Sequence, residues 1–134
     1  MSQENGEGLR QGLELWRQSD YSSATAAFDP QLEWDFSAHP LPDWPNTGSG
    51  RDDFQRQLAE YVSGWREYRA EVRELIDAGD EVVVVLHETV AVRESDAILD
   101  RDLHCVWTIR DGVVVRLRVF KTRADAREAA GLRE

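Results

Sequence analysis

The sequence contains very little cysteine and no long apolar stretch. Cys105 is the single cysteine among 134 residues, which excludes an internal disulfide framework and a zinc site built from several cysteines. No apolar run approaches the roughly 18 residues that a membrane-spanning helix needs. Residues 1–8 are polar and lack the apolar segment of a secretory signal, so we expect them to be flexible and the protein to be cytoplasmic.

An excess of basic charge is also missing. The formal net charge is −10, and a phosphate backbone or an anionic membrane would repel such a surface, so we expect neither nucleic acid nor membrane as a partner. Hydrophobic residues make up 41% and charged residues 31%, a balance typical of globular proteins. The length predicts one domain over residues 1–134.

Helical periodicity marks the first half of the chain. Apolar residues at positions 9, 13 and 16 share one helical face and predict a helix over residues 7–18. Asp20 is a predicted N-cap for a second, short helix. The strongest pattern runs through residues 51–65 and predicts a long amphipathic helix, which Ser49 and Asp52 would cap as a capping box.

The remaining segments alternate with a period of two, as strands do. Leu32, Trp34 and Phe36 alternate with acidic residues and predict one strand before the proline-rich loop 37–50. Further strands are predicted after residue 67, over residues 82–92, around 103–109 and over 113–121, joined by short turns. A last short helix is predicted over the C-terminal tail, residues 122–134, with Thr122 as its cap and Gly131 closing it.

Strands joined by short turns must be antiparallel, and the amphipathic helix must lay its apolar stripe on their sheet. We therefore predict the α+β class, with a cone-shaped, curved, antiparallel or mixed sheet wrapped around a long helix. Three helices precede most of the sheet, and one short helix follows it.

Several short segments carry a family resemblance through their order and spacing. They are Leu13-Glu14-Leu15-Trp16, Phe28-Asp29-Pro30, Gly50-Arg51-Asp52-Asp53-Phe54, Ile76-Asp77-Ala78-Gly79-Asp80, residues 106–112 and the tail 123–132. The chain resembles the nuclear transport factor 2-like superfamily, and within it the SnoaL-like, polyketide-cyclase-like group. The resemblance covers roughly Leu9 to Leu132.

The resemblance implies a homodimer, often formed through the outer sheet face, and a pocket for small, mostly apolar molecules. Members include isomerases, cyclases, dehydratases, epoxide hydrolases and proteins without known activity, so the fold alone does not name a reaction. The known catalytic sets are broken here. Phe36, Cys105 and Val119 stand where acidic residues would be, and Leu103 follows Arg101 where an epoxide hydrolase would carry Asp.

The concave side of the sheet and the long helix are expected to present an aromatic-rich set of side chains. Such a set packs as plain core or lines a ligand pocket, and we keep both interpretations open. The expected ligand-binding residues are Trp16, Trp34, Phe36, Trp44, Phe54, Leu58, Tyr61, Trp65, Leu86, Leu103, Cys105, Trp107, Leu117 and Val119.

Three polar residues are catalytic candidates. Glu88 follows Val84 and Leu86 on one strand face, where a carboxylate can act as general acid or base; alternatively it lies in water at the strand end. His39 either rims the mouth of the cone or is a solvated loop residue. Tyr21 can point its hydroxyl into the cavity while its ring packs.

Several other residues are expected to have structural roles. Cys105 is expected to be a small apolar filler, since no inward histidine is evident to activate it. His87 and His104 fall on the outer sheet face, and two histidines with no third ligand in view make only a weak metal site, so neither metal nor cofactor is expected. The apolar outer residues Val83, Val85, Val106 and Phe120 predict a homodimer through that face.

Together these patterns predict a small-molecule-binding protein with an aromatic-lined apolar pocket, which acts, if it catalyses, as a cofactor-free isomerase, cyclase or dehydratase. The alternative is a non-catalytic dimerising or partner-binding module whose cone is filled.

Overall fold

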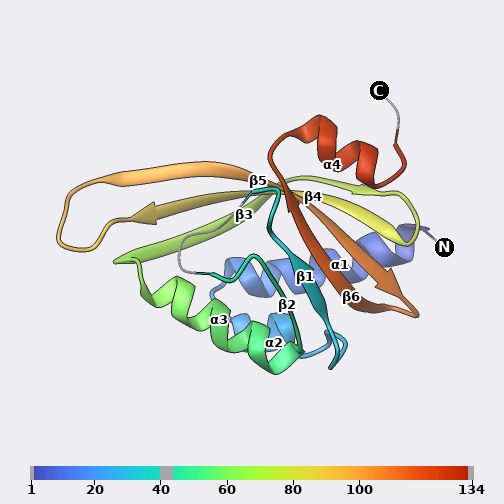
Figure 1. Ribbon diagram of the computed structural model, residues 1–134, viewed down its shortest axis with the longest axis horizontal. Coiled ribbons are helices and arrows are strands. Elements are labelled where there is room, and N and C mark those ends of the chain that lie inside the picture. The colour runs from blue at the N-terminus through green and yellow to red at the C-terminus, as the bar shows by residue number, and fades with distance from the viewer. Residues whose placement is uncertain (1, 40–43, 133–134) are drawn as a thin grey trace.

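The computed structural model describes residues 2–39 and 44–132, and it confirms the predicted α+β class. Four helices and a six-stranded mixed sheet make up these residues, and the sheet is curved but not closed (Figure 1). The elements are α1 (Ser2–Arg17), α2 (Tyr21–Thr25), β1 (Glu33–Asp35), β2 (Thr47–Ser49), α3 (Arg51–Ser63), β3 (Glu67–Asp77), β4 (Glu81–Ala91), β5 (Ile98–Arg110), β6 (Val113–Phe120) and α4 (Arg123–Ala129).

The sheet has the strand order β2-β1-β6-β5-β4-β3. The four long strands form consecutive antiparallel pairs, as their short turns require, whereas β1 runs parallel to β6. β4 and β5 extend as an arm beyond the body of the sheet (Figure 1). β5 pairs with β4 from Ile98 to Thr108 but with β6 only from His104 onward, so the arm has β5 as one edge.

Helices α1, α2 and α3 lie on one side of the sheet and α4 lies on the other (Figure 1). The capping predictions are confirmed at two of three helices. The side chain of Asp20 accepts a hydrogen bond from the Ser23 N–H, and Thr122 accepts one from the Asp125 N–H. The capping box of Ser49 is wrong: the N-cap of α3 is Gly50, whose φ of 103° only glycine adopts readily, and no side chain caps it.

The first helix starts earlier than its periodicity indicates. It begins at Ser2, within the segment 1–8 that we expected to be flexible. The Asn5 side chain donates a hydrogen bond to the Gly79 carbonyl at 2.8 Å, and the Gly6 N–H donates to Asp77 Oδ2 at 2.6 Å. These two bonds tie the helix to the β3–β4 turn. A sequence pattern cannot reveal them, because glycines disfavour a helix and the partners lie far along the chain.

Helix α4 covers part of the outer sheet face. Ala126 and Ala130 pack against Val83 and Val106, both of which are fully buried. The sequence assigned these valines to a subunit interface, but the chain shields them with its own C-terminal helix. The expectation that they lie exposed until a partner covers them is therefore wrong, because seven residues of helix already remove them from water.

The opposite, concave side holds the main core. Its aromatic rings contact one another edge-on or tilted, as in the pairs Phe28–Trp107 and Trp44–Phe54. The Trp34 ring packs directly against Gly48, where a Cβ would lie 2.2 Å from a ring carbon. Among the described residues, no helix is long and apolar enough to cross a membrane.

Candidate functional site

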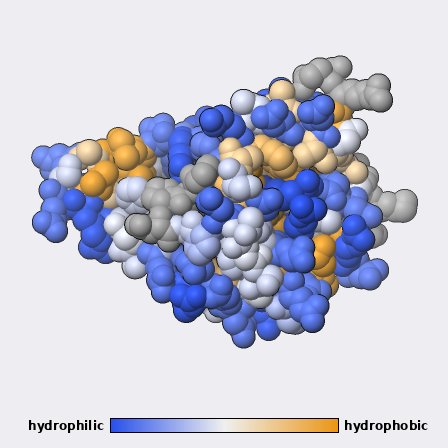
Figure 2. Space-filling view, in the orientation of Figure 1, coloured by the Kyte–Doolittle hydropathy of each residue, from blue (hydrophilic) through white to orange (hydrophobic). Residues whose placement is uncertain are grey.

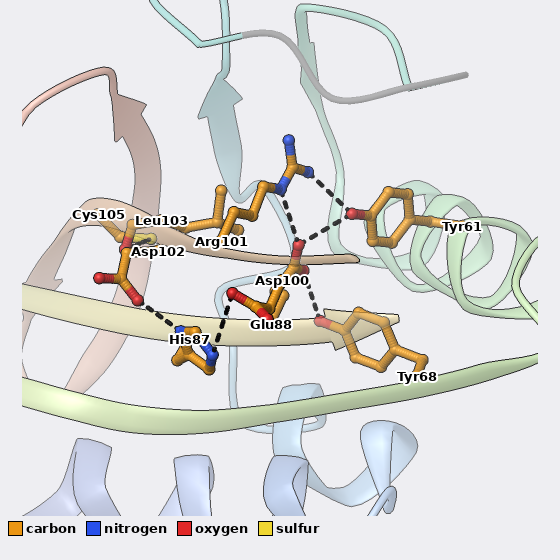
Figure 3. Close-up of polar contacts among 9 residues, drawn as sticks. All are labelled: Tyr61, Tyr68, His87, Glu88, Asp100, Arg101, Asp102, Leu103 and Cys105. Carbon is orange, nitrogen blue, oxygen red and sulfur yellow. Dashed lines mark hydrogen bonds and ion pairs between the residues drawn. The ribbon is translucent and has the colours of Figure 1, made fainter. Parts of the chain in front are cut away.

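A carboxylate lies buried on the concave side of the sheet. Glu88 of β4 is 3% exposed, so the alternative that it stands in water at the strand end is wrong. Its Oε1 accepts a hydrogen bond from the Tyr61 hydroxyl at 3.0 Å, and its Oε2 accepts one from the Tyr68 hydroxyl at 2.7 Å. Arg101 Nε lies 3.3 Å from Oε1 (Figure 3). We call these four residues the Glu88 cluster.

Three elements supply the partners of Glu88. Tyr61 comes from the last turn of α3, Tyr68 from β3, and Arg101 from β5, where it stands directly opposite Glu88 in the β4–β5 pairing. Arg101 also donates from Nη2 to the Tyr61 hydroxyl at 3.0 Å, so the cluster is a connected network. Every oxygen of the buried carboxylate thus has a donor, which is what a buried charge requires.

The two hydroxyls in the cluster remain protonated. Burial first, and then the charge of Glu88, raise the pKa of Tyr61 and of Tyr68 well above the ordinary value for tyrosine. Burial alone would lower the pKa of Arg101, but the neighbouring Tyr61 and Glu88 outweigh it and raise that pKa. The cluster therefore presents two hydroxyl donors and a permanent cation around one carboxylate.

A small cavity, here called the inner cavity, lies between α3 and the sheet beside the Glu88 cluster. It has a volume of about 50 Å³. A typical small-molecule pocket measures about 300–1,000 Å³, so the cone is mostly filled by its aromatic side chains. Expected ligand-binding residues that line it are Trp16, Phe36, Trp44, Phe54, Leu58, Tyr61, Leu86, Leu103, Cys105, Trp107, Leu117 and Val119.

A second space, here called the outer cavity, lies toward the β4–β5 arm. It has a volume of about 150 Å³ and is lined by Trp65, Val90 and Leu99 together with Arg101. Tyr61 and Glu88 line both cavities, so the Glu88 cluster stands at their boundary. Leu99 is 52% exposed, and Figure 2 shows a hydrophobic patch at the end of this arm.

Two expected pocket residues lie outside the inner cavity. Trp65 lines the outer cavity instead. Because α3 ends at Ser63, Trp65 does not continue the apolar face of that helix. Trp34 lines neither cavity: its ring packs against Phe54, and its Nε1–H donates to the Pro45 carbonyl at 3.3 Å.

The two other catalytic candidates have different surroundings. His39 is half-buried, and its pKa is lowered by burial first and then by the positive charges of Arg101 and Lys121. Tyr21 lines neither the inner nor the outer cavity. Its ring packs against Trp16 and Tyr68, and its hydroxyl lies 3.5 Å from Ser19 Oγ on the exposed side of α2.

Cys105 is buried beside the inner cavity, as expected for an apolar filler. Burial first, and then the nearby charge of Glu88, raise the pKa of its thiol to about 12. A thiol that holds its proton so firmly is a poor nucleophile at neutral pH.

On the outer sheet face, His87 lies beside two aspartates. His87 Nδ1 lies 2.7 Å from Asp102 Oδ1, and its Nε2 lies 4.0 Å from Asp100 Oδ1 (Figure 3). Within the described residues, no three His, Cys, Asp or Glu side chains come together in a way that could hold a metal ion.

Two members of the Glu88 cluster, Arg101 and Tyr68, are not among the site residues predicted from the sequence. The sequence places Arg101 only in an incomplete epoxide hydrolase set, and it assigns Tyr68 no role. A signal for Arg101 exists in the sequence: Glu88 and Arg101 are equally far from the centre of the hairpin turn between Glu94 and Ser95, so a tight hairpin pairs them. Tyr68 has no comparable signal, because its contact depends on how β3 packs beside β4.

A larger space of about 270 Å³ lies on the other side of Trp16 and Trp107, between α1, α2 and the β5–β6 turn. None of the described side chains that line it is titratable. Of these three spaces, only the inner and outer cavities have titratable side chains in their lining, and both share Tyr61 and Glu88.

Comparison with known proteins agrees with the resemblance found in the sequence. The family model of the SnoaL-like domain matches residues 9–117, which confirms the family prediction. Among curated proteins, none matches the chain by sequence.

Solved structures share the fold over nearly the whole chain. TerC, co-crystallised with polyporic acid, is 22% identical, with 96% of this chain and 98% of TerC covered and a TM-score of 0.75. An NTF2-like protein of unknown function from Burkholderia pseudomallei is 20% identical, covering 93% and 95%, with a TM-score of 0.74. Bal32a, from a soil-derived mobile gene cassette, is 19% identical, covering 88% of each chain, with a TM-score of 0.76. At these identities the likeness concerns the fold.

Proposed function

Since the chain belongs to the SnoaL-like domain family, we propose that it binds a small, largely apolar, aromatic molecule at the boundary of the inner and outer cavities. The observation that carries this proposal is the buried Glu88 carboxylate, which lines both cavities and is held by three donors from other elements. Maintaining a buried charge costs free energy, and functional sites are where proteins commonly accept that cost.

The proposed binding mode divides the ligand between the two cavities. The outer cavity offers apolar contacts with Trp65, Val90 and Leu99, which suit an aromatic ring. The inner cavity has room for a small end group of the same molecule. The co-crystallisation of TerC, a protein of the same fold, with polyporic acid supports the choice of a small organic ligand.

The proposed chemistry is cofactor-free proton transfer, as in an isomerisation, cyclisation or dehydration. Glu88 is the candidate base and acid, because its carboxylate lies at the cavity boundary. Arg101 and Tyr61 are the candidate donors to a ligand oxygen that gains negative charge as the proton leaves. His39, which is half-buried and whose pKa is lowered by burial, is a second candidate proton acceptor.

The alternative is a non-catalytic module that binds a partner or dimerises, with a filled cone. The small volume of the inner cavity favours it, because aromatic side chains already occupy most of the cone. The two functions differ in whether the cavity admits a small molecule.

Ligand titration separates these functions. Tryptophan fluorescence should respond to members of a panel of aromatic compounds that includes polyporic acid, since Trp16, Trp44, Trp65 and Trp107 line the two cavities. Native mass spectrometry of the purified protein should also detect any small molecule that remains bound.

A matched pair of variants at one position controls the titration. Cys105→Leu adds volume comparable to the inner cavity and should abolish the response, whereas Cys105→Ala enlarges the cavity and should preserve it. A wild-type protein that responds to no compound, and that carries no small molecule in native mass spectrometry, would favour the filled-cone module.

A further inference from the structure

Along the arm, one side of β5 has no neighbouring strand (Figure 1). β5 pairs with β4 on its other side, and its pairing with β6 begins only at His104, so no described strand lies beside residues 98–103 on this side. We call this side of residues 98–103 the free edge. An edge strand presents main-chain N–H and C=O groups that can pair with another extended chain, and proteins usually cover such groups.

A hydrogen bond at the start of β5 shows which residues face the free edge. The Val92 N–H donates to the Ala97 carbonyl at 3.0 Å, so the main-chain groups of Ala97 point toward β4. Successive residues of an antiparallel strand point these groups to alternate sides. The N–H and C=O groups of Ile98, Asp100 and Asp102 therefore point toward the free edge.

Apolar side chains are exposed at the same place. Ile98 and Leu99 are the two large hydrophobic residues whose side chains are exposed in the described part of the chain. Alternation places them on opposite faces of the strand, and Leu99 lines the outer cavity on the concave side. A strand added at the free edge would therefore cover apolar surface on both faces as well as form main-chain hydrogen bonds.

The charge of the free edge indicates the chemistry of its partner. Asp100 and Asp102 lie on the outer face, and their side chains are 62% and 42% exposed. A partner strand with basic residues two positions apart would place a cation opposite each aspartate. Opposite charges that face each other across two strands stabilise the pairing.

A second copy of this chain lacks that complement. Two copies related by a two-fold axis would pair antiparallel, with matching faces on the same side. A pairing centred on Asp100 places this aspartate opposite itself, and a pairing centred on Arg101 places Asp100 opposite Asp102. Like charges directly opposite each other destabilise a sheet, so these pairings disfavour the second copy.

We infer that the free edge of β5 binds an extended segment of a partner protein, which adds an antiparallel strand with basic residues opposite Asp100 and Asp102 and an apolar residue beside Leu99. In such strand addition, main-chain hydrogen bonds supply affinity and alternate side chains supply specificity. This binding does not require a small molecule in either cavity, so it is separate from the proposed function.

A capped synthetic peptide of alternating lysine and valine is the probe. With its lysines opposite the two aspartates, the lysine N–H groups face β5 and the valine N–H groups face away. N-methylation of the lysine nitrogens of the main chain should therefore weaken binding at least about tenfold, whereas N-methylation of the valine nitrogens should preserve it. The two modified peptides have equal charge, and calorimetric titration of the wild-type protein compares them.

Hydrogen exchange of the wild-type protein gives the second measurement. In the free protein, the amides of Asp100 and Asp102 should exchange rapidly, whereas those of Arg101 and Leu103 should be protected by β4. The unmodified peptide should slow exchange at Asp100 and Asp102. Protection of these two amides before the peptide is added would mean that a second copy or the chain itself already covers the edge, which overturns the inference.

A pair of substitutions tests the role of charge. Asp100→Asn should weaken binding of the unmodified peptide about threefold, since it removes one cross-strand ion pair. Asp111→Asn is the matched control: Asp111 is exposed in the β5–β6 turn, and its loss changes the net charge equally. Equal weakening by both variants, equal binding of the two N-methylated peptides, or no binding of the unmodified peptide overturns the inference and leaves the proposed function intact.

Discussion

Arg101 stands directly opposite Glu88 across the β4–β5 pairing, and its Nε lies 3.3 Å from the buried Glu88 Oε1. The two partners differ in their contact with solvent: the Glu88 side chain is 4% exposed and the Arg101 side chain 34%. Removing Glu88 and removing Arg101 should therefore affect stability unequally. Water can solvate Arg101 when its partner is lost, but it cannot reach the buried Glu88.

This asymmetry predicts the stability of two variants. Glu88→Gln should lower the free energy of unfolding by about 1–3 kcal/mol, since the half-exposed Arg101 can be solvated. Arg101→Gln should cost about 3 kcal/mol or more, because it leaves a buried carboxylate without its cation. Chemical denaturation measures both. Asp100→Asn is the control: its side chain is 62% exposed, and the change should stay within about 0.5 kcal/mol. Equal losses for both substitutions would contradict the asymmetry.

The Cys105 thiol should be unreactive in the folded protein. Burial, followed by the charge of Glu88, raises its pKa to about 12, so almost no thiolate exists at pH 8. A disulfide reagent such as dithionitrobenzoate should label Cys105 only when the protein is unfolded with denaturant, which also serves as the positive control. Rapid labelling of the native protein at pH 8 would show that the inner cavity wall opens far more readily than its burial indicates.

His39 should titrate below the ordinary histidine value of 6.5, because burial and then the charge of Arg101 lower its pKa. The folded state therefore binds fewer protons than the unfolded state just below pH 6.5. As the pH falls through this window, the contribution of His39 to stability decreases. NMR titration of the His39 ring should give the lowered midpoint, and His39→Gln should remove this part of the pH dependence. A midpoint at or above 6.5 would be inconsistent with a half-buried site beside two cations.

The homodimer predicted from the sequence needs an exposed apolar residue on the outer sheet face, since α4 already covers Val83 and Val106. Ile98 is such a residue: it is 55% exposed and alternates away from Arg101 on β5. Light scattering should give about twice the chain mass of 15.3 kDa, and Ile98→Asp should reduce it to the monomer value. Leu99→Asp, on the opposite strand face, is the matched control and should leave the dimer intact. A monomeric wild-type protein would refute the dimer.

Much of the fold follows from sequence periodicity. The stripe of Phe54, Leu58 and Tyr61 predicts α3 and its buried face, and alternation along β5 places Leu103, Cys105 and Trp107 on the concave side. These predictions succeed because a helix or strand buries one face, and apolar residues therefore recur at the regular spacing of that face.

Periodicity says less about how far an element extends and what covers it. The start of α1 depends on bonds from Asn5 and Gly6 to a turn more than 70 residues away. The docking of α4 over Val83 depends on the path of the chain after β6. An apolar outer face has the same pattern whether a second subunit or the chain itself covers it.

The sequence by itself determined which face of a helix or strand each residue occupies, and it assigned Glu88 and the aromatic residues to the concave side of the sheet. It also indicated the SnoaL-like family through the order of its segments. Only the tertiary structure decided the partners. It turned the Tyr68 hydroxyl toward Glu88 and the Tyr21 hydroxyl toward Ser19, although both tyrosines were available to the cavity. The physical reason is that alternation and helical spacing record which side of an element avoids water. Which side chains then meet depends on strand register and on how rings pack against one another.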